Sequence, residues 1–321
     1  VTIPVFMVGN LDGIAMSAQY GSAATGTPGT VKVAITPWGQ GHANDLGFVP
    51  GGVAGWHNYA TPAAQFMAGA ATANAYKGID VAFIANYGSS PATNVKVISS
   101  TAFTPTGGSS SVQHTDTTEY AGPFVGVVSL PGDDTRDSIL SMITDEYNLT
   151  ATGPGRFDVT YTITSDSADD FNADNTITSS FYLSDSVYCK SRYNFTAQKP
   201  IRNIGYTWGT GTPFVWGPFY YVAQGGSYFS KAQYSISGLG TAGSTIFLSG
   251  SSELFIFKWE DGANGQPGDS ILQAGELMLK ATGKYDYLAA SDTSGADYTI
   301  SELRDPGDNA IPNFALEANS W

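Results

Sequence analysis

The residues best suited to bind a ligand form an acidic, glycine-rich loop that follows a predicted strand. The segment Glu260-Asp261-Gly262-Ala263-Asn264-Gly265-Gln266-Pro267-Gly268-Asp269 places oxygen-bearing side chains along a tight turn. Because Ca²⁺ takes about six to eight oxygen ligands, such a loop can wrap around it. We therefore predict calcium as the cofactor, with Glu260, Asp261, Asn264 and Asp269 as ligands, although the spacing is not that of an EF-hand. The simpler interpretation, which we favour, is an Asn-Gly or Asp-Gly hairpin turn.

Two other acidic segments are weaker candidates for the same chemistry. One lies between two predicted strands and contains Asp166, Asp169, Asp170, Asn172 and Asp174. The other is the Asp-Pro-Gly-Asp turn around Asp305 and Asp308. Apart from calcium, we expect no cofactor.

A band of aromatic residues could bind sugars, because flat pyranose faces pack on Trp and Tyr rings. The band consists of Tyr206, Trp208, Phe214, Trp216, Phe219, Tyr220, Tyr221, Tyr228 and Phe229. We predict Trp208 and Trp216 as its exposed members and hence as the sugar platform. The alternative, which we favour, is that these rings pack in a core.

No catalytic constellation is visible in the sequence. None of the histidines, His42, His57 and His114, lies in an HExxH motif, and no G-x-S-x-G elbow exists. The segment 238–243 matches G-x-G-x-x-G, but strand-forming residues follow it where a dinucleotide site needs a helix. We therefore predict a non-enzymatic protein. Catalysis by His42 and His57, within residues 36–75, remains the weakest alternative.

Composition restricts the class of protein further. The net charge of −14 and the scattered Lys and Arg residues argue against nucleic-acid binding. No apolar run approaches the length of about 18 residues that a membrane helix needs. The single cysteine, Cys189, lies beside apolar residues and is expected to be a buried, inert thiol. The N-terminus, without Met or a basic region, is either a processed or a cut end, and it would fit an exported protein after removal of its signal.

Period-two alternation of apolar residues dominates the elements that must position these groups. Large apolar side chains take the odd positions of 157–164, and the pattern continues over 177–183, which predicts a hairpin. Residues 79–84 and 94–98 predict a second hairpin. The best helix candidate is 135–147, although a strand with a loop fits equally well.

These patterns predict an all-β fold with tandem β-sandwiches. We expect a loop-rich β region over residues 1–75, an immunoglobulin-like sandwich over 76–186 and a jelly-roll sandwich over 187–321. Short strands at regular spacing, 232–237, 244–248, 253–259 and 276–281, favour the last assignment.

Parts of the chain resemble known families. Residues 79–98 look like the opening of a CARDB-type immunoglobulin-like domain, and 155–166 with 172–176 look like its closing hairpin. The region after residue 190, notably Leu254-Phe255-Ile256-Phe257-Lys258-Trp259-Glu260-Asp261, resembles jelly-roll modules that follow such domains. The combination is similar to modules of large secreted Bacteroidetes proteins, often exported by the type IX secretion system. This resemblance implies a cell-surface location.

The same resemblance implies O-glycosylation, because Bacteroidetes glycoproteins carry glycans at Asp-Ser/Thr followed by an apolar residue or Thr. The chain offers five such positions, of which one or two could arise by chance. The implied glycosylated residues are Thr117, Ser138, Ser167, Ser186 and Ser270.

The first functional hypothesis is an extracellular structural or adhesive protein, and its fibre-forming version needs strand pairing between chains. Val1 to Val8 is a candidate arm for that pairing. The alternative is a carbohydrate-binding accessory region of a secreted hydrolase. The expected partners are copies of the chain itself or other cell-surface proteins, with glycans as a further class.

Overall fold

The computed structural model describes most of the chain. The described residues are 42–54, 59–71, 77–125, 139–143, 146–190, 193–197, 199–200, 217–235, 250–269, 271–288, 292–293, 296–311 and 314–321. Strands predominate among them and form several sheets, which confirms the all-β prediction. The strand-pairing arm at 1–8 lies outside the described residues.

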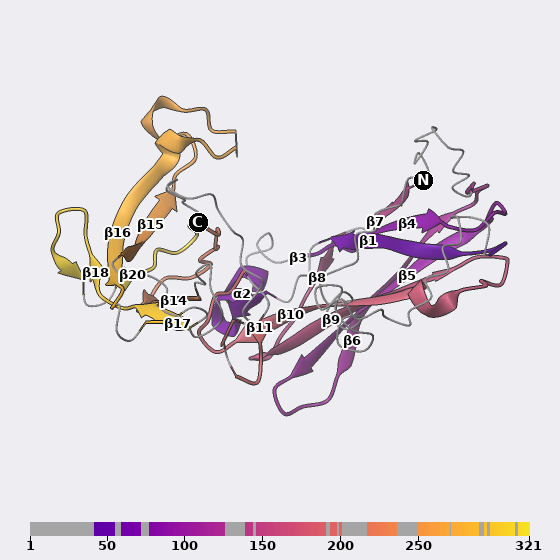
Figure 1. Ribbon diagram of the computed structural model, residues 1–321, viewed down its shortest axis with the longest axis horizontal. Helices are drawn as coiled ribbons and strands as arrows, with labels where there is room; N and C mark the ends of the chain where they lie inside the picture. The colour runs from indigo at the N-terminus through magenta and orange to yellow at the C-terminus, as the bar shows by residue number, and fades with distance from the viewer. Residues whose placement is uncertain are drawn as a thin grey trace, which may run out of the picture.

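A five-stranded and a three-stranded sheet form the N-terminal half (Figure 1). The five-stranded sheet has the order β2-β10-β9-β5-β6, and the three-stranded sheet has the order β1-β4-β7. A short pair, β3 and β8, lies beside them. The strands are β1 (Leu46–Ala54), β2 (Ala60–Pro62), β3 (Lys77–Gly78), β4 (Val81–Asn86), β5 (Val95–Pro105), β6 (Ser111–Tyr120), β7 (Ile139–Ile143), β8 (Tyr147–Asn148), β9 (Gly155–Thr164) and β10 (Thr176–Ser184).

The two larger sheets pack face to face as a sandwich. One core cluster takes Phe48 from β1 and Ile84 from β4, and it joins them to Val97 of β5 and Tyr161 of β9. The odd residues of β9 point into the core: Phe157, Val159, Tyr161 and Ile163 are all buried. β9 pairs antiparallel with β10, so the predicted hairpin with the strongest period-two signal is confirmed.

The second predicted hairpin is wrong. β4 pairs with β1 and β7 in one sheet, whereas β5 pairs with β6 and β9 in the other. The turn after β4 therefore crosses between the layers. Alternation shows that each segment is a half-buried strand, but it does not choose the partner.

In the described part of the segment 135–147 the alternative of strands holds: residues 139–143 and 147–148 are strands, not a helix. β7 forms a ladder with β4 from Ile139 to Ile143, and β8 pairs with β3. A short apolar run fits a strand or a helix equally well, and here the hydrogen-bonding partner decides.

The chain contains one α-helix among its described residues, α2 (Ala63–Ala71), within the region predicted as separate. Pro62 directly precedes the helix, and five of its nine residues are alanines; both features favour a helix. The described part of the N-terminal region, 42–54 and 59–71, belongs to the sandwich, because β1 pairs with β4 and β2 with β10. The expected boundary at residue 75 is therefore corrected.

The C-terminal half contains one four-stranded sheet, β15-β16-β18-β19, and three two-stranded pairs, β11-β12, β13-β20 and β14-β17. A jelly roll remains a prediction. Short 3₁₀ turns are η2 (Asn172–Asp174), η3 (Ala263–Gly265) and η4 (Ala274–Glu276). The strands are β11 (Tyr193–Asn194), β12 (Lys199–Pro200), β13 (Tyr228–Phe229), β14 (Ala232–Ser235), β15 (Ser251–Trp259), β16 (Leu277–Asp286), β17 (Asp297–Ile300), β18 (Leu303–Arg304), β19 (Ala310–Ile311) and β20 (Phe314–Ala315).

Helix α2 lies between the two halves in Figure 1 and contacts both. On the sandwich side, Phe66 is fully buried against Phe157 and Phe181. On the other side, the buried Gln65 side chain accepts the N–H of Ala223 at 2.8 Å and that of Gln224 at 3.0 Å. Its amide nitrogen donates to the Gln224 carbonyl at 3.0 Å. One helix thus joins the halves through packing and backbone hydrogen bonds.

Candidate functional site

The acidic loop after β15 is built around a carboxylate that the sequence did not single out. Glu276 is buried, and its side chain accepts hydrogen bonds from Trp259 Nε1 at 2.9 Å, Gly262 N at 2.7 Å and Gln273 N at 3.1 Å. Gly262 adopts a left-handed conformation (φ 79°) that glycine favours. The indole and backbone N–H groups of this loop therefore point at the buried Glu276 carboxylate.

The four predicted calcium ligands do not converge on one point. Glu260 pairs with Lys258 at 3.0 Å, and Asp261 accepts the N–H of Asp269 at 3.2 Å. Asn264 donates to the Gly275 carbonyl at 2.6 Å, and Asp269 accepts the N–H of Ile271 at 2.9 Å. These contacts match the simpler interpretation of the segment as a hydrogen-bonded turn.

The lowered pKa of Glu276 predicts that the protein loses stability in acid. The Trp259 indole N–H, then the N–H groups of Gly262 and Gln273, hold the pKa of Glu276 below its usual value. A lowered folded-state pKa stabilises the protein above the ordinary glutamate pKa of about 4.3, and this contribution is lost as pH falls through the folded-state value. We expect Glu276→Gln to lower the thermal midpoint at pH 7, with the difference from wild type shrinking in acid. The exposed Glu302→Gln is the control, and an unchanged midpoint for Glu276→Gln at pH 7 would contradict the assignment.

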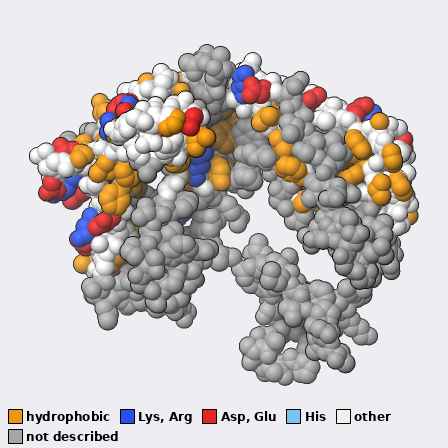
Figure 2. All heavy atoms as spheres, turned by 90° about the horizontal axis from the view of Figure 1, so that it is seen from above, with side chains coloured by type: hydrophobic (Ala, Val, Ile, Leu, Met, Phe, Trp, Pro, Cys, Tyr) orange, Lys and Arg blue, Asp and Glu red, His pale blue; other side chains and the backbone are white. Residues whose placement is uncertain are grey.

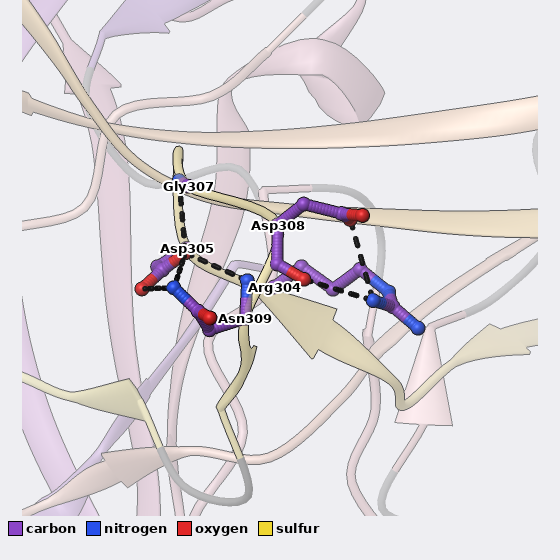
Figure 3. Close-up of polar contacts among 5 residues, drawn as sticks. All are labelled: Arg304, Asp305, Gly307, Asp308 and Asn309. Atoms are coloured by element: carbon purple, nitrogen blue, oxygen red, sulfur yellow. Dashed lines mark hydrogen bonds and ion pairs between the residues drawn. The ribbon is translucent and has the colours of Figure 1, made fainter.

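The turn between β18 and β19 is also closed by its own donors (Figure 3). Asp305 Oδ1 accepts the N–H of Gly307 at 2.8 Å and that of Asn309 at 2.9 Å. Arg304 Nη1 donates to the Asp308 carbonyl at 2.9 Å and lies 3.3 Å from Asp308 Oδ1. The backbone N–H of Asn309 leads the contacts that lower the pKa of Asp305. Both aspartates have structural partners in this turn.

The third acidic segment, between β9 and β10, clamps the chain that enters β1. Asp170 Oδ2 accepts the N–H groups of Ala43 and Asn44, each at 2.9 Å. Asp169 Oδ2 accepts the N–H of Leu46 at 2.8 Å. The Asn44 and Ala43 N–H groups lower the pKa of Asp170.

Two other members of the predicted set lie outside this clamp. Asp166 Oδ2 accepts from Thr93 Oγ1 at 3.1 Å and from Asn94 Nδ2 at 2.6 Å. The Asn172 carbonyl accepts the N–H of Asn175, as expected at a 3₁₀ turn. The segment therefore ties together loops at one end of the sandwich.

Asp45 is the residue of this region that sequence reasoning missed. Its side chain is buried, and its carbonyl accepts the N–H of Tyr87 at 2.6 Å. Burial, followed by the charge of Asp174, raises the pKa of Asp45. Burial likewise raises the pKa of Asp174. No sequence signal links the two residues, because Asp45 comes from the N-terminal region and Asp174 from the β9–β10 connection.

The predicted sugar platform, Trp208 and Trp216, lies outside the described residues. The described part of the aromatic band is used mainly for packing. Tyr220 lies 5.1 Å from Tyr188, and Tyr221 lies 5.0 Å from Trp321, between ring centroids. Tyr228, in contrast, is 61% exposed.

The described histidines pack against aromatic rings. His114 stacks on Tyr147 with ring centroids 3.8 Å apart, and His42 stacks on Phe171 at 5.9 Å. The Tyr147 hydroxyl donates to Asp80 Oδ1 at 2.7 Å and lies 2.6 Å from Thr101 Oγ1. These contacts lock strands together and do not form a nucleophile–base pair. His57 lies outside the described residues.

Cys189 is buried, as predicted, and its backbone forms an isolated antiparallel β-bridge with Ala60 of β2.

Three of the implied glycosylation positions are exposed: Thr117 on β6, Ser167 in the β9–β10 connection and Ser186 after β10. Their exposure makes them accessible to modification. Ser138, Ser270 and the glycine-rich segment 238–243 lie outside the described residues.

β15 offers the clearest interaction surface of the described chain. It is a nine-residue strand whose only strand partner among these residues is β16. On its outward face Phe255 and Phe257 are 43% and 42% exposed, with ring centroids 6.4 Å apart. Figure 2 shows hydrophobic side chains gathered in patches beside charged ones on the C-terminal half.

The opposite face of this hairpin is covered. Ala281, opposite Ile256, is fully buried. A Cβ on Gly283, opposite Leu254, would lie 2.5 Å from Ile300 Cγ2. The sheet therefore has one packed face and one face that exposes aromatic rings at a strand edge.

Within the described part of the chain, no three Asp, Glu, His or Cys side chains gather as a metal centre. No helix in that part is long and apolar enough to cross a membrane. No protein-family model matches the sequence, and a comparison with curated proteins finds no significant relative.

Proposed function

We propose that this chain is a non-catalytic, extracellular structural or adhesive cell-surface protein whose copies associate by strand pairing. The observation that carries the proposal is the β15 edge with its exposed Phe255 and Phe257. Native proteins usually protect such edges with charges, prolines or short strands, because unpaired N–H and C=O groups recruit other strands. An edge that keeps aromatic side chains exposed suits pairing with a partner.

The backbone of β15 supports this interpretation. In the described chain, one contact uses the outer edge, the hydrogen bond from Trp259 N to the Trp321 carbonyl at 3.1 Å. That contact lies at the C-terminal end of the strand, and no described residue pairs with the outer edge of the stretch from Ser251 to Lys258. Main-chain hydrogen bonds would supply affinity and the rings would supply specificity.

The connection between the halves also suits a structural role. Gln65 binds the backbone at Ala223 and Gln224, and Tyr188 Oη donates to the Tyr221 carbonyl at 3.0 Å. Cross-links of this kind limit hinge motion between the halves. Low charge content, 13% of residues, and the resemblance to secreted Bacteroidetes proteins favour a location outside the cell. As part of the same proposal, the N-terminal sandwich is an immunoglobulin-like domain, the C-terminal half is a jelly-roll domain, and the protein is exported by the type IX secretion system.

The proposal predicts self-association that depends on the β15 edge. We expect the full chain to form concentration-dependent oligomers or filaments in sedimentation velocity and negative-stain electron microscopy. The double variant Phe255→Lys/Phe257→Lys should remain monomeric, because charges on an edge oppose strand addition. Its thermal midpoint should stay close to that of wild type, since both rings are already partly exposed.

Tyr228→Lys is the matched control, because it makes the same change at an exposed aromatic residue on another sheet. It should assemble like wild type. Dispersed monomers of the wild-type chain at every concentration, or equal assembly of the double variant, would refute strand pairing through β15.

A further inference from the structure

Three buried side-chain oxygens at one end of the sandwich have no hydrogen-bond partner. They are Asp45 Oδ1, Asp174 Oδ1 and Asn175 Oδ1. The Asp45 side chain is more than nine-tenths buried, with 8% exposure. Buried carboxylate oxygens are costly unless they are paired or bind a metal. Two carboxylates left in this condition on neighbouring segments therefore indicate a missing positive partner.

Gly47 shows how closely these segments approach. A Cβ at Gly47 would lie 2.4 Å from Asp174 Oδ2 and 2.8 Å from Tyr87 Cε2. The Asp174 carboxylate thus lies directly on the chain at the start of β1. The charge of Asp174 acts on the buried Asp45 carboxylate, so the two side chains lie near each other. Asp45 and Asp174 are therefore neighbouring carboxylates at the start of β1, where a side chain at position 47 would displace Asp174.

The surrounding groups do not neutralise these carboxylates. Asp169 and Asp170 add negative charge, but their oxygens are used by the backbone N–H groups of residues 43, 44, 46 and 171. Of the described residues, His42 is the one basic side chain whose charge acts on Asp45 and Asp174. Backbone N–H groups bind the Asp169 and Asp170 carboxylates, whereas Oδ1 of Asp45 and Oδ1 of Asp174 have no hydrogen-bond partner.

We propose that Asp45, Asp174 and Asn175 bind a hard divalent cation, with Ca²⁺ as the best match. The three free atoms are all oxygens, two from carboxylates and one from an amide, which is the ligand chemistry of Ca²⁺ and not of thiol- or imidazole-bound metals. Water and main-chain carbonyls would complete a shell of about six to eight oxygens. The proposed ligands are two carboxylates and one amide. This set therefore differs from a metal centre built from three Asp, Glu, His or Cys side chains, of which the described residues contain none.

Such a cation would hold the entry to β1 against the β9–β10 connection. The two segments are more than a hundred residues apart in the sequence, so a bound ion would cross-link distant parts of the sandwich. The site is independent of the β15 edge, and its failure would leave the proposed strand pairing untouched.

Calorimetric titration of the EDTA-treated full chain with CaCl₂ tests the site, together with thermal unfolding with and without the ion. We expect one saturable binding event and a higher midpoint in Ca²⁺, because a ligand that binds only the folded state stabilises it. Asp45→Asn and Asp174→Asn should each weaken Ca²⁺ binding by about tenfold or more, since each removes a charged ligand. Mg²⁺ should bind more weakly, because it requires stricter octahedral geometry.

Asp305→Asn is the matched control, because that carboxylate is occupied by N–H donors of its own turn; it should bind Ca²⁺ like wild type. If an aspartate variant fails to fold, Asn175→Ala replaces it in the comparison and should also weaken binding. Absence of saturable binding by the wild-type chain would overturn the proposal. It would equally be overturned if Asp45→Asn and Asp174→Asn bound Ca²⁺ as tightly as wild type.

Discussion

Phe66→Ala should lower the free energy of unfolding by about 3–5 kcal/mol, the typical cost of truncating a buried phenylalanine. Phe66 is fully buried, and its ring lies 5.4 Å from Phe157 and 6.0 Å from Phe181, between centroids. The variant loses these ring contacts and leaves a cavity between α2 and the five-stranded sheet. Chemical denaturation monitored by circular dichroism measures the change.

The neighbouring Met67→Ala provides the control on the same helix. Met67 is 37% exposed, so its truncation should cost well under half as much. This pair of variants also tests the domain assignment, because a separate N-terminal region would not transmit the Phe66 defect to the sandwich. Equal, small effects of Phe66→Ala and Met67→Ala would mean that α2 is not part of the sandwich core.

Gln65→Ala should lower the free energy of unfolding by about 1–3 kcal/mol, because it leaves the buried N–H of Ala223 without its partner and removes the bonds to the Gln224 backbone. The lost bonds are those from the N–H groups of Ala223 and Gln224 and that to the Gln224 carbonyl. Each unsatisfied buried group costs about 1–3 kcal/mol, although such costs are not additive. Denaturation measures the total cost, and amide hydrogen exchange at Ala223 and Gln224 should accelerate in the variant.

Gln233→Ala, at an exposed glutamine of β14, is the control for the loss of a glutamine side chain. It should leave both the stability and the exchange of Ala223 unchanged. The prediction fails if Gln65→Ala exchanges like wild type at Ala223, because the amides would then be protected by other contacts. Faster exchange and lower stability of Gln65→Ala would show that one helix side chain fixes the C-terminal half to the sandwich.

The β9–β10 hairpin is the part of the fold that the sequence predicted best. The four apolar side chains at odd positions of β9 occur in a run without Gly or Pro, so the pattern admits one interpretation. The segments 79–84 and 94–98 carry equally good strand patterns, yet they separate into different sheets. Alternation records the burial of one face, whereas the choice of partner depends on how the sheets stack.

Helix α2 shows a different limit. Its alanines and glycine gave little hydrophobic periodicity, and Phe66 is its one large apolar side chain that is buried. The signal that could have found it is Pro62 followed by a run of helix formers. Its role in joining the halves depends on contacts with residues 157, 181 and 223, which no local pattern contains.

For the acidic segments, too, the sequence located the candidate sites but not the contacts that their carboxylates make. Residue type and turn composition identified three places rich in carboxylates, and all three lie in connections between strands, where their oxygens accept hydrogen bonds. That Asp169 and Asp170 bind the chain before β1 was not predictable, because their N–H donors come from residues 43–46, far away in the sequence. The unsatisfied Asp45 was missed for that reason.

The sequence by itself determined the all-β class, the burial of β9, the buried state of Cys189 and the acidic turns, because each follows from side-chain chemistry within a few residues. Only the tertiary structure decided the pairing of strands, the place of α2 between the halves, the exposed aromatic edge of β15 and the meeting of Asp45 with Asp174. These features depend on contacts between segments far apart in the chain, and their free energy exists only once the chain has folded.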